Sequence, residues 1–173
     1  KKGLDIALQA VARLRANNAS LKLHYTIIGD GSRREALKKL IKNLKIRDIV
    51  TMIGGKNKQE VIKWIATSDI LLAPSYTSQD GDIEGIMNVL KEAGVAKTVV
   101  VATDHAGAPE LIEHNRTGVL ARQNDVDDLT EKLEYAITNS DHWSEWRNNL
   151  KREIEERFDG LKVYPQLIEV LMN

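Results

Sequence analysis

The 173-residue sequence predicts an α/β fold: a Rossmann-like, doubly wound parallel sheet with helices on both faces and a helical C-terminal tail. Three observations support this class. Short apolar runs alternate with amphipathic stretches, and such alternation implies right-handed crossovers between parallel strands. Residues 98–102 are apolar without polar alternation, as in a strand buried on both faces. Glycine lies near the exit of each of the first four predicted strands.

The predicted strands are short apolar runs bounded by glycine or polar residues. They span residues 23–28, 50–53, 70–73, 98–102 and 118–121. The predicted helices carry apolar residues at helical spacing, such as Ile6, Ala10 and Leu14 in the first and Leu37, Ile41 and Leu44 in the second. In chain order they span residues 4–17, 33–45, 58–67, 86–96, 107–114, 126–139, 142–157 and 161–172.

No repeat or Pro/Gly/Ser-rich linker divides the sequence, so we expect residues 1–139 to form the sheet domain. Residues 140–173 are expected to form helices that pack on that domain through aromatic anchors, which are Trp143, Trp146, Phe158 and Tyr164. The sequence starts at Lys1 without Met and enters a helical pattern at once. We interpret it as a fragment whose first strand lies upstream.

Composition excludes several classes of protein. There is no cysteine, which removes zinc fingers, thiol catalysis and a disulfide scaffold. No apolar run approaches the roughly 18 residues of a membrane helix, and no signal peptide is visible, so we expect a cytoplasmic protein. Residues 1–64 hold 15 basic and 5 acidic residues. We interpret the basic helix at 33–45 as a solvated face, not a nucleic-acid surface, because no aromatic residues interleave with its lysines.

Ligands of open parallel sheets bind outside the carboxyl ends of the strands. The predicted exits are Gly29-Asp30-Gly31-Ser32, Gly54-Gly55-Lys56, Pro74-Ser75 leading into Asp80–Gly85, and Thr103–Glu110. Glycine lets backbone amides approach a phosphate closely. Gly29-x-Gly31 is equally compatible with a tight turn, because Arg34 replaces the third glycine of a dinucleotide fingerprint.

Glu84 and Glu92 flank the start of helix 86–96 and would lie about 12 Å apart if all eight steps were helical. That spacing suits a ligand of nucleotide-sugar length, although a dipole-favoured glutamate and an ordinary surface glutamate explain it equally well. We interpret Asp80-x-Asp82 as a turn, not a divalent metal site. His105 is either a site residue or a partner in a loop hydrogen bond.

Five motifs follow one another along nearly the whole chain: Lys2-Gly3-Leu4-Asp5, Ile27–Gly31, Ser68–Ser75, Glu84-Gly85 through Glu92-Ala93, and Gly107–Ile112. Together they resemble the group 1 family of retaining glycosyltransferases with the GT-B architecture. The resemblance implies the C-terminal, donor-binding half of such an enzyme. Met87 and Lys97-Thr98 depart from the family pattern. These departures bear on the loop geometry and the choice of sugar more than on the class of enzyme.

The resemblance also implies roles for particular residues. Glu84 would be catalytic and lie against the donor sugar, while Glu92 would bind ribose hydroxyls. Lys2 would contact the diphosphate beside an arginine that lies upstream. Backbone amides would stabilise the departing phosphates, so no metal or other cofactor is expected. The donor-binding positions implied in this way are Lys2, Gly29, Gly31, Gly54, Gly55, Lys56, Gly85, Ile86, Met87 and Glu92.

The activity implied is transfer of a sugar from a nucleotide-diphospho-sugar donor, with retention, to a saccharide or lipid-linked acceptor. A separate N-terminal domain would bind most of the acceptor, so this fragment alone is expected to be inactive. Residues 82–85 are similar to exopolysaccharide-type members, such as those of colanic-acid-like biosynthesis in bacteria. Peripheral association with the inner face of the membrane is expected of the full-length protein. A sugar-nucleotide epimerase of GT-B fold and a non-catalytic nucleotide-binding module remain as alternatives.

Overall fold

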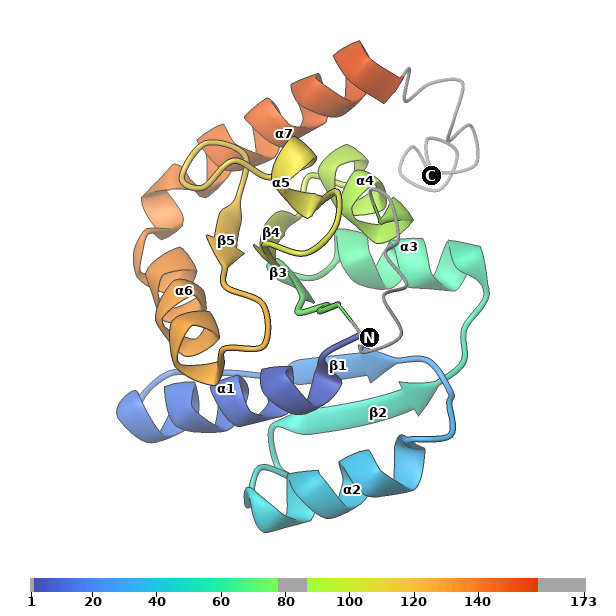
Figure 1. Ribbon diagram of the computed structural model, residues 1–173, viewed down its shortest axis with the longest axis vertical. Helices are drawn as coiled ribbons and strands as arrows, with labels where there is room; N and C mark the ends of the chain where they lie inside the picture. The colour runs from blue at the N-terminus through green and yellow to red at the C-terminus, as the bar shows by residue number, and fades with distance from the viewer. Residues whose placement is uncertain (1, 78–86, 159–173) are drawn as a thin grey trace.

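The structure, a computed structural model, describes residues 2–77 and 87–158 (Figure 1). The expected helix at 161–172 and residues Glu84, Gly85 and Ile86 lie outside the described residues. Helices and strands alternate as the sequence predicts. In chain order they are α1 (Leu4–Asn17), β1 (Tyr25–Ile28), α2 (Arg34–Asn43), β2 (Val50–Gly54), α3 (Lys58–Ala66), β3 (Ile70–Ala73), α4 (Asn88–Val95), β4 (Val99–Thr103), α5 (Ala108–Leu111), β5 (Val119–Ala121), α6 (Val126–Thr138), the 3-10 turn η1 (Ser140–His142) and α7 (Trp143–Phe158).

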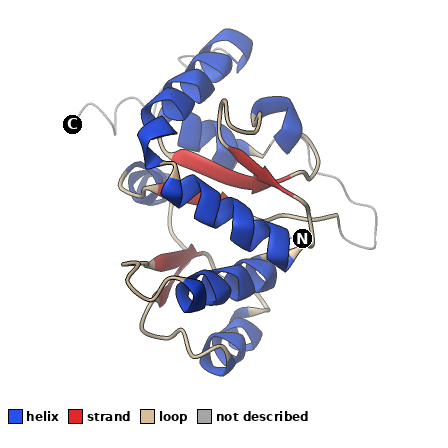
Figure 2. Cartoon of the chain, turned by 90° about the vertical axis from the view of Figure 1, so that its left-hand side faces the viewer, coloured by secondary structure: helices blue, strands red, loops and turns tan. Residues whose placement is uncertain are grey.

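All strand pairs of the described residues are parallel, which confirms the predicted class. The five described strands belong to two sheets. They form a two-stranded sheet, β1-β2, and a three-stranded sheet, β3-β4-β5 (Figure 2). Residues of both β1 and β3 line a cavity of about 640 Å³.

Strand β4 is buried along its whole length and separates two hydrophobic cores. Val99 and Val101 contribute to a core with residues of α1, β5 and α6. Val100 and Ala102 contribute to the opposite core, with residues of α4, α5 and α7. Successive strand residues point to opposite faces, so helices cover both sides of this sheet as predicted.

Helix α1 contributes apolar residues to both halves of the molecule. Its Ile6, Val11 and Leu14 pack with β4, β5 and α6. Leu8, which is fully buried, packs instead with Ile27 of β1 and with apolar residues of α2. Figure 1 shows α1 lying beside α6 and along β1. Both sheets are therefore anchored on one helix.

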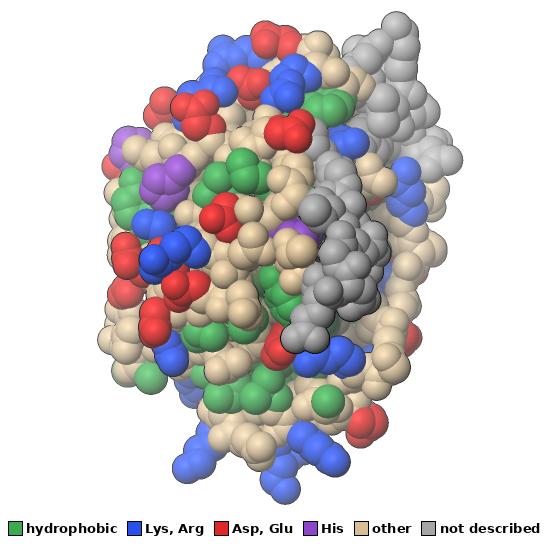
Figure 3. Space-filling view, viewed as in Figure 1, with side chains coloured by type: hydrophobic (Ala, Val, Ile, Leu, Met, Phe, Trp, Pro, Cys, Tyr) green, Lys and Arg blue, Asp and Glu red, His purple; other side chains and the backbone are tan. Residues whose placement is uncertain are grey.

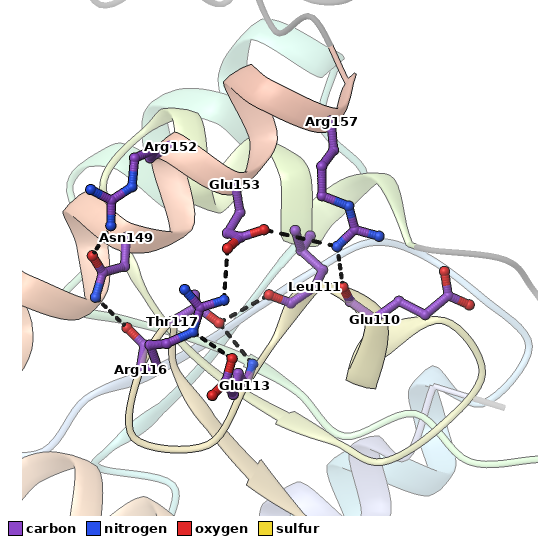
Figure 4. A network of polar contacts seen from close by, with 9 residues as sticks. All are labelled: Glu110, Leu111, Glu113, Arg116, Thr117, Asn149, Arg152, Glu153 and Arg157. Carbon is purple, nitrogen blue, oxygen red and sulfur yellow. Dashed lines mark hydrogen bonds and ion pairs between the residues drawn. The ribbon is translucent and has the colours of Figure 1, made fainter.

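Helix α7 packs on both cores, with Trp146 in the core of α1 and α6 and with Leu150 and Ile154 in the core of α4 and α5. Trp146, Leu150 and Ile154 are fully buried. Arg116, between α5 and β5, forms ion pairs with Glu113 and with Glu153 of α7, the latter at 2.6 Å (Figure 4). The Asn149 amide donates to the Arg116 carbonyl at 3.0 Å, and Arg157 donates to the Glu110 carbonyl (Figure 4).

Two helices are shorter than the sequence predicts, and local contacts or backbone conformation explain each difference. The helix expected at 107–114 is only Ala108–Leu111, because the Thr117 hydroxyl donates to the Leu111 carbonyl and accepts from the Glu113 amide. The helix expected at 86–96 begins at Asn88, because Met87 is extended with φ −62° and ψ 129°. Eight helical steps from Glu84 to Glu92 therefore do not exist, and the 12 Å estimate does not apply.

The basic helix α2 carries its charges into solvent. Lys38, Lys39 and Lys42 are exposed, while Leu37 and Ile41 are buried. Figure 3 shows Lys and Arg side chains gathered at the lower end of the molecule, where Figure 1 places α2. The arrangement agrees with a solvated helix face. Within residues 2–77 and 87–158, no helix is long and apolar enough to cross a membrane.

Gly94 sets how closely α4 and α7 approach, which leads to a test of stability. A Cβ at Gly94 would lie 2.2 Å from Ile154 Cδ1 and 2.9 Å from Leu150 Cγ. We expect Gly94→Val to lower the free energy of unfolding by about 1–3 kcal/mol through overpacking, as measured by urea denaturation. The control Ala16→Val, at an exposed position of α1, should change it by no more than about 0.5 kcal/mol. Equal losses in the two variants would contradict the close packing.

Candidate functional site

The exits of β1 and β2 are joined by hydrogen bonds around Asp30. The Gly29 amide donates to the Gly54 carbonyl at 2.8 Å. The Asp30 carboxylate accepts from the Gly55 amide at 2.6 Å and from Arg34 at 2.7 Å. The structure therefore brings together the predicted residues Gly29, Gly54 and Gly55. Asp30 was not predicted as a site residue, although its place between two glycines at a strand exit was a usable signal.

Backbone is accessible at the β1 exit. No heavy atom lies within 4 Å of the position that a Cβ would take at Gly29 or Gly31. Gly29 has φ +130° and Gly54 has φ +78°, conformations that side chains with a Cβ rarely adopt. These glycines leave open backbone beside the Asp30 carboxylate, so a ligand could approach the main chain there.

The N-terminal end of α1 lies against the exit of β3. Gly3 has φ +59°, and a Cβ on it would lie 1.7 Å from the Pro74 carbonyl oxygen, so no larger residue fits. This contact places Lys2, which is exposed, next to the end of β3. The predicted diphosphate contact Lys2 thus lies at the same end of the molecule as the glycine exits (Figure 1).

Arg33 connects three of these segments, a role that the sequence did not reveal. It forms an ion pair at 3.1 Å with Asp5 in the first turn of α1. The pKa of Arg33 is raised mainly by the hydrogen bond to Asp5 and, to a smaller extent, by one to Tyr76. Since Arg33 precedes α2 and Tyr76 follows β3, one guanidinium bridges α1 and the exits of β1 and β3.

The exits of β3, β4 and β5 are joined in a second network. The Thr103 hydroxyl donates to the Ser75 carbonyl. The Thr77 amide donates to Gln123 Oε1 at 3.0 Å, and the Thr77 hydroxyl lies 3.2 Å from Nδ1 of the buried His105. The contacts of His105 fit the loop hydrogen bond that was one of its two interpretations. Thr77 and Gln123 had no distinctive sequence signal.

At the start of α4, the N-cap residue Met87 makes no side-chain cap hydrogen bond. Met87 is buried, and the Ser75 hydroxyl donates to its sulfur at 3.3 Å. Met87 provides no side-chain cap, and the first turn of α4 contains no acidic residue. The positive end of this helix is therefore not neutralised by a neighbouring carboxylate of the helix itself.

Glu92 lies in the second turn of α4 and is partly buried. Burial raises the pKa of its carboxyl group, and the nearby positive charge of Lys58 opposes that shift. Lys58 is the first residue of α3, directly after the β2 exit, whose Lys56 forms an ion pair with Glu60 at 3.1 Å. Glu92 and the Gly54–Lys56 exit are therefore placed near the same end of α3.

Metal ligands are not grouped in the part of the chain that the structure describes. There, no three His, Asp or Glu side chains lie close enough to hold an ion together. Asp80 and Asp82 lie outside the described residues, as does the predicted catalytic residue Glu84. The described geometry gathers backbone amides, a carboxylate at Glu92 and basic groups.

Comparisons with known proteins agree with this arrangement. A family model described as "Glycosyl transferases group 1" matches residues 1–156. The amylovoran biosynthesis glycosyltransferase AmsK of Erwinia amylovora is 35% identical over 171 residues, which are 99% of this chain and 42% of AmsK. A Salmonella typhimurium protein named for colanic acid biosynthesis, the glycosyltransferase WcaL, is 33% identical over 174 residues, covering 100% of this chain and 42% of WcaL.

A solved structure shares the fold. The crystal structure of Anabaena Alr3699/HepE in complex with UDP superposes with a TM-score of 0.80 at 23% sequence identity. The match covers 99% of this chain and 45% of HepE. The chain thus spans less than half the length of these relatives. Because the family model covers most of the sequence, the chain belongs to the glycosyl transferases group 1 family.

Proposed function

We propose that this chain is the donor-binding half of a glycosyltransferase that transfers a sugar from a nucleotide-diphospho-sugar to an acceptor with retention of configuration. One observation carries the proposal. In this member of the group 1 family, hydrogen bonds connect the loops that follow the strands at one end of the molecule. Ligands of parallel α/β sheets bind at that end. The acceptor is assigned to a separate domain, since the relatives are more than twice as long as the matched region.

The donor would lie along the strand exits. The accessible backbone at Gly29 and Gly31 and the N-terminal end of α4 would receive the diphosphate, with Lys2 adding positive charge. The Gly54–Lys56 exit would contact the base, and Glu92 would accept hydrogen bonds from ribose hydroxyls. Glu84 would lie against the donor sugar, and the backbone amides of Gly85, Ile86 and Met87 would meet the phosphates. The helix end and the basic residues would stabilise the departing nucleoside diphosphate.

The names of the relatives support a proposal for the substrate class. AmsK and WcaL are named for amylovoran and colanic acid biosynthesis, and HepE was solved with UDP. We infer assembly of a bacterial exopolysaccharide, with a nucleoside diphosphate sugar as donor. A lipid-linked acceptor would bring the longer protein to the membrane surface.

Glu92 gives the most direct test of donor binding. We expect Glu92→Ala to weaken UDP or GDP binding by about tenfold to a hundredfold, the effect of losing hydrogen bonds to a charged acceptor. Isothermal titration calorimetry on the chain measures this change. The control Glu131→Ala, on an exposed position of α6, should bind as the unchanged protein does. Absence of binding by the folded, unchanged chain would count against the donor site itself.

The raised pKa of Glu92 predicts a pH dependence. The carboxyl group is protonated at a higher pH than an ordinary glutamate, and the neutral acid is a poorer acceptor for ribose hydroxyls. The affinity advantage of the unchanged chain over Glu92→Gln should therefore shrink as the pH falls from about 7 to about 5. Titration of the nucleotide phosphate affects both proteins equally and cancels in the ratio. A ratio independent of pH would contradict a role for the Glu92 carboxylate.

The raised pKa of Glu92 also predicts how the stability of the folded protein changes with pH. A carboxyl group with a raised pKa in the folded state binds its proton more tightly there than in the unfolded chain. Without ligand, the unchanged protein should therefore lose stability relative to Glu92→Gln as the pH rises through the ordinary glutamate pKa to the raised one. Urea denaturation of both proteins across this range measures the difference. A difference that grows in the opposite direction would contradict the desolvation of Glu92.

A further inference from the structure

The loop that leads from β2 into α3 is held by the neighbouring exit of β1 (Figure 1). The Gly54 carbonyl accepts from the Gly29 amide at 2.8 Å, and the Gly55 amide donates to Asp30 Oδ2 at 2.6 Å. This carbonyl and this amide belong to one planar peptide unit, since a peptide joins the carbonyl of one residue to the amide of the next. Both polar groups of the 54–55 peptide therefore bond to consecutive residues of the β1 exit.

The Asp30 carboxylate is itself held by Arg34. Asp30 Oδ1 accepts from Arg34 Nη1 at 2.7 Å, and Arg34 Nη2 donates to the Met52 carbonyl of β2 at 3.4 Å. One carboxylate oxygen thus bonds to Arg34 and the other to Gly55. A Cβ at Gly55 would lie only 3.2 Å from Asp30 Oδ2, so the carboxylate lies directly against the loop. Arg34, which stands where a dinucleotide fingerprint has its third glycine, fixes the direction of this carboxylate.

The other end of the loop is held by the start of α3. Asn57 and Glu60 form a capping box, in which the Glu60 amide donates to Asn57 Oδ1 at 2.9 Å and the Asn57 amide donates to Glu60 Oε2 at 3.1 Å. Glu60 also forms an ion pair with Lys56 at 3.1 Å. Between the two held ends lies the peptide unit of the Gly55 carbonyl and the Lys56 amide, which takes part in none of these bonds.

The orientation of this Gly55–Lys56 peptide decides what the loop offers to a ligand. The C=O and N–H groups of a trans peptide point in opposite directions, so only one of them faces a given ligand. With its carbonyl bond to Gly29 alone, the 54–55 peptide could turn about that bond, and the next peptide would turn with it. Glycine permits such rotation because it has no Cβ. The second bond, from the Gly55 amide to Asp30, removes this freedom.

We propose that Asp30 is a positioning residue that determines base specificity: by holding the Gly55 amide, it makes the Gly55–Lys56 peptide present one polar group, and not the other, to the donor base. This role rests on the proposed function, which places the base at the β2 exit. Uracil carries an acceptor oxygen where cytosine carries a donor amino group, and guanine and adenine differ in the same way. A fixed peptide therefore favours one base of each pair, and a mobile peptide adapts to both.

Binding of four nucleotides tests this role. UDP, CDP, GDP and ADP share a ribose and a diphosphate, and each is titrated by calorimetry into the chain and its variants. The unchanged chain should prefer UDP over CDP, the reverse, or one of GDP and ADP over the other, by at least about tenfold, the effect of one matched hydrogen bond. Asp30→Ala should remove most of this preference and leave the affinity for inorganic pyrophosphate unchanged, since the diphosphate does not depend on the orientation of this peptide.

Two further variants separate positioning from a general effect on the fold. Glu35→Ala removes an ion pair of the same length, 2.7 Å to Lys38, from the helix that carries Arg34, and it should keep the full preference. Asp30→Asn keeps an acceptor for the Gly55 amide but loses the ion pair with Arg34. Its preference should therefore lie between those of the unchanged chain and Asp30→Ala. If Asp30→Ala does not fold, the reduced preference of Asp30→Asn is the test.

The outcomes also separate this role from donor binding itself. A merely structural role of Asp30 would weaken the binding of all four nucleotides equally, so an unchanged preference in the folded variants would overturn the positioning role while the donor site stands. The same holds if the unchanged chain binds both members of each pair with equal affinity. If the folded, unchanged chain binds none of the four nucleotides, the proposed donor site is wrong, and the role of Asp30 is wrong with it.

Discussion

Helix α1 packs apolar residues against both sheets, and the relative position of the strand exits follows from this packing. Leu8 belongs to the core of β1 and α2, while Ile6, Val11 and Leu14 belong to the core of β4, β5 and α6. Amphipathic helices normally bury one stripe against one sheet. Because α1 buries residues in two cores, it fixes the β1-β2 sheet relative to the β3-β4-β5 sheet.

The candidate site depends on the polar contacts that fix the ends of these strands. Asp30 joins the β1 and β2 exits, and Arg33 links Asp5 at the start of α1 with Tyr76 after β3. Loops at strand ends have few apolar contacts to hold them, so charge-assisted hydrogen bonds supply the constraint. These hydrogen bonds leave the glycine backbone accessible. A phosphate-binding surface needs loops that are held in place and backbone amides that the phosphate can reach.

Much of this arrangement could be predicted because it rests on local pattern. The apolar run at 98–102 predicted a strand buried on both faces, and β4 is such a strand. Glycines at strand exits predicted Gly29, Gly54 and Gly55 as neighbours, since parallel strands end at one edge. Asp5, Arg33 and Thr77 could not be found in this way, because their partners lie far away in sequence and charged or hydroxyl residues are common in loops.

The sequence by itself determined the α/β class and the order of helices and strands, because hydrophobic periodicity and glycine placement are local properties. Five motifs in order carried the resemblance to the family. Only the tertiary structure decided that the strands form two sheets around a cavity, that α1 bridges two cores, and that burial raises the pKa of Glu92. Edge pairing, desolvation and long-range ion pairs depend on which distant segments meet. No pattern within a single segment carries that information.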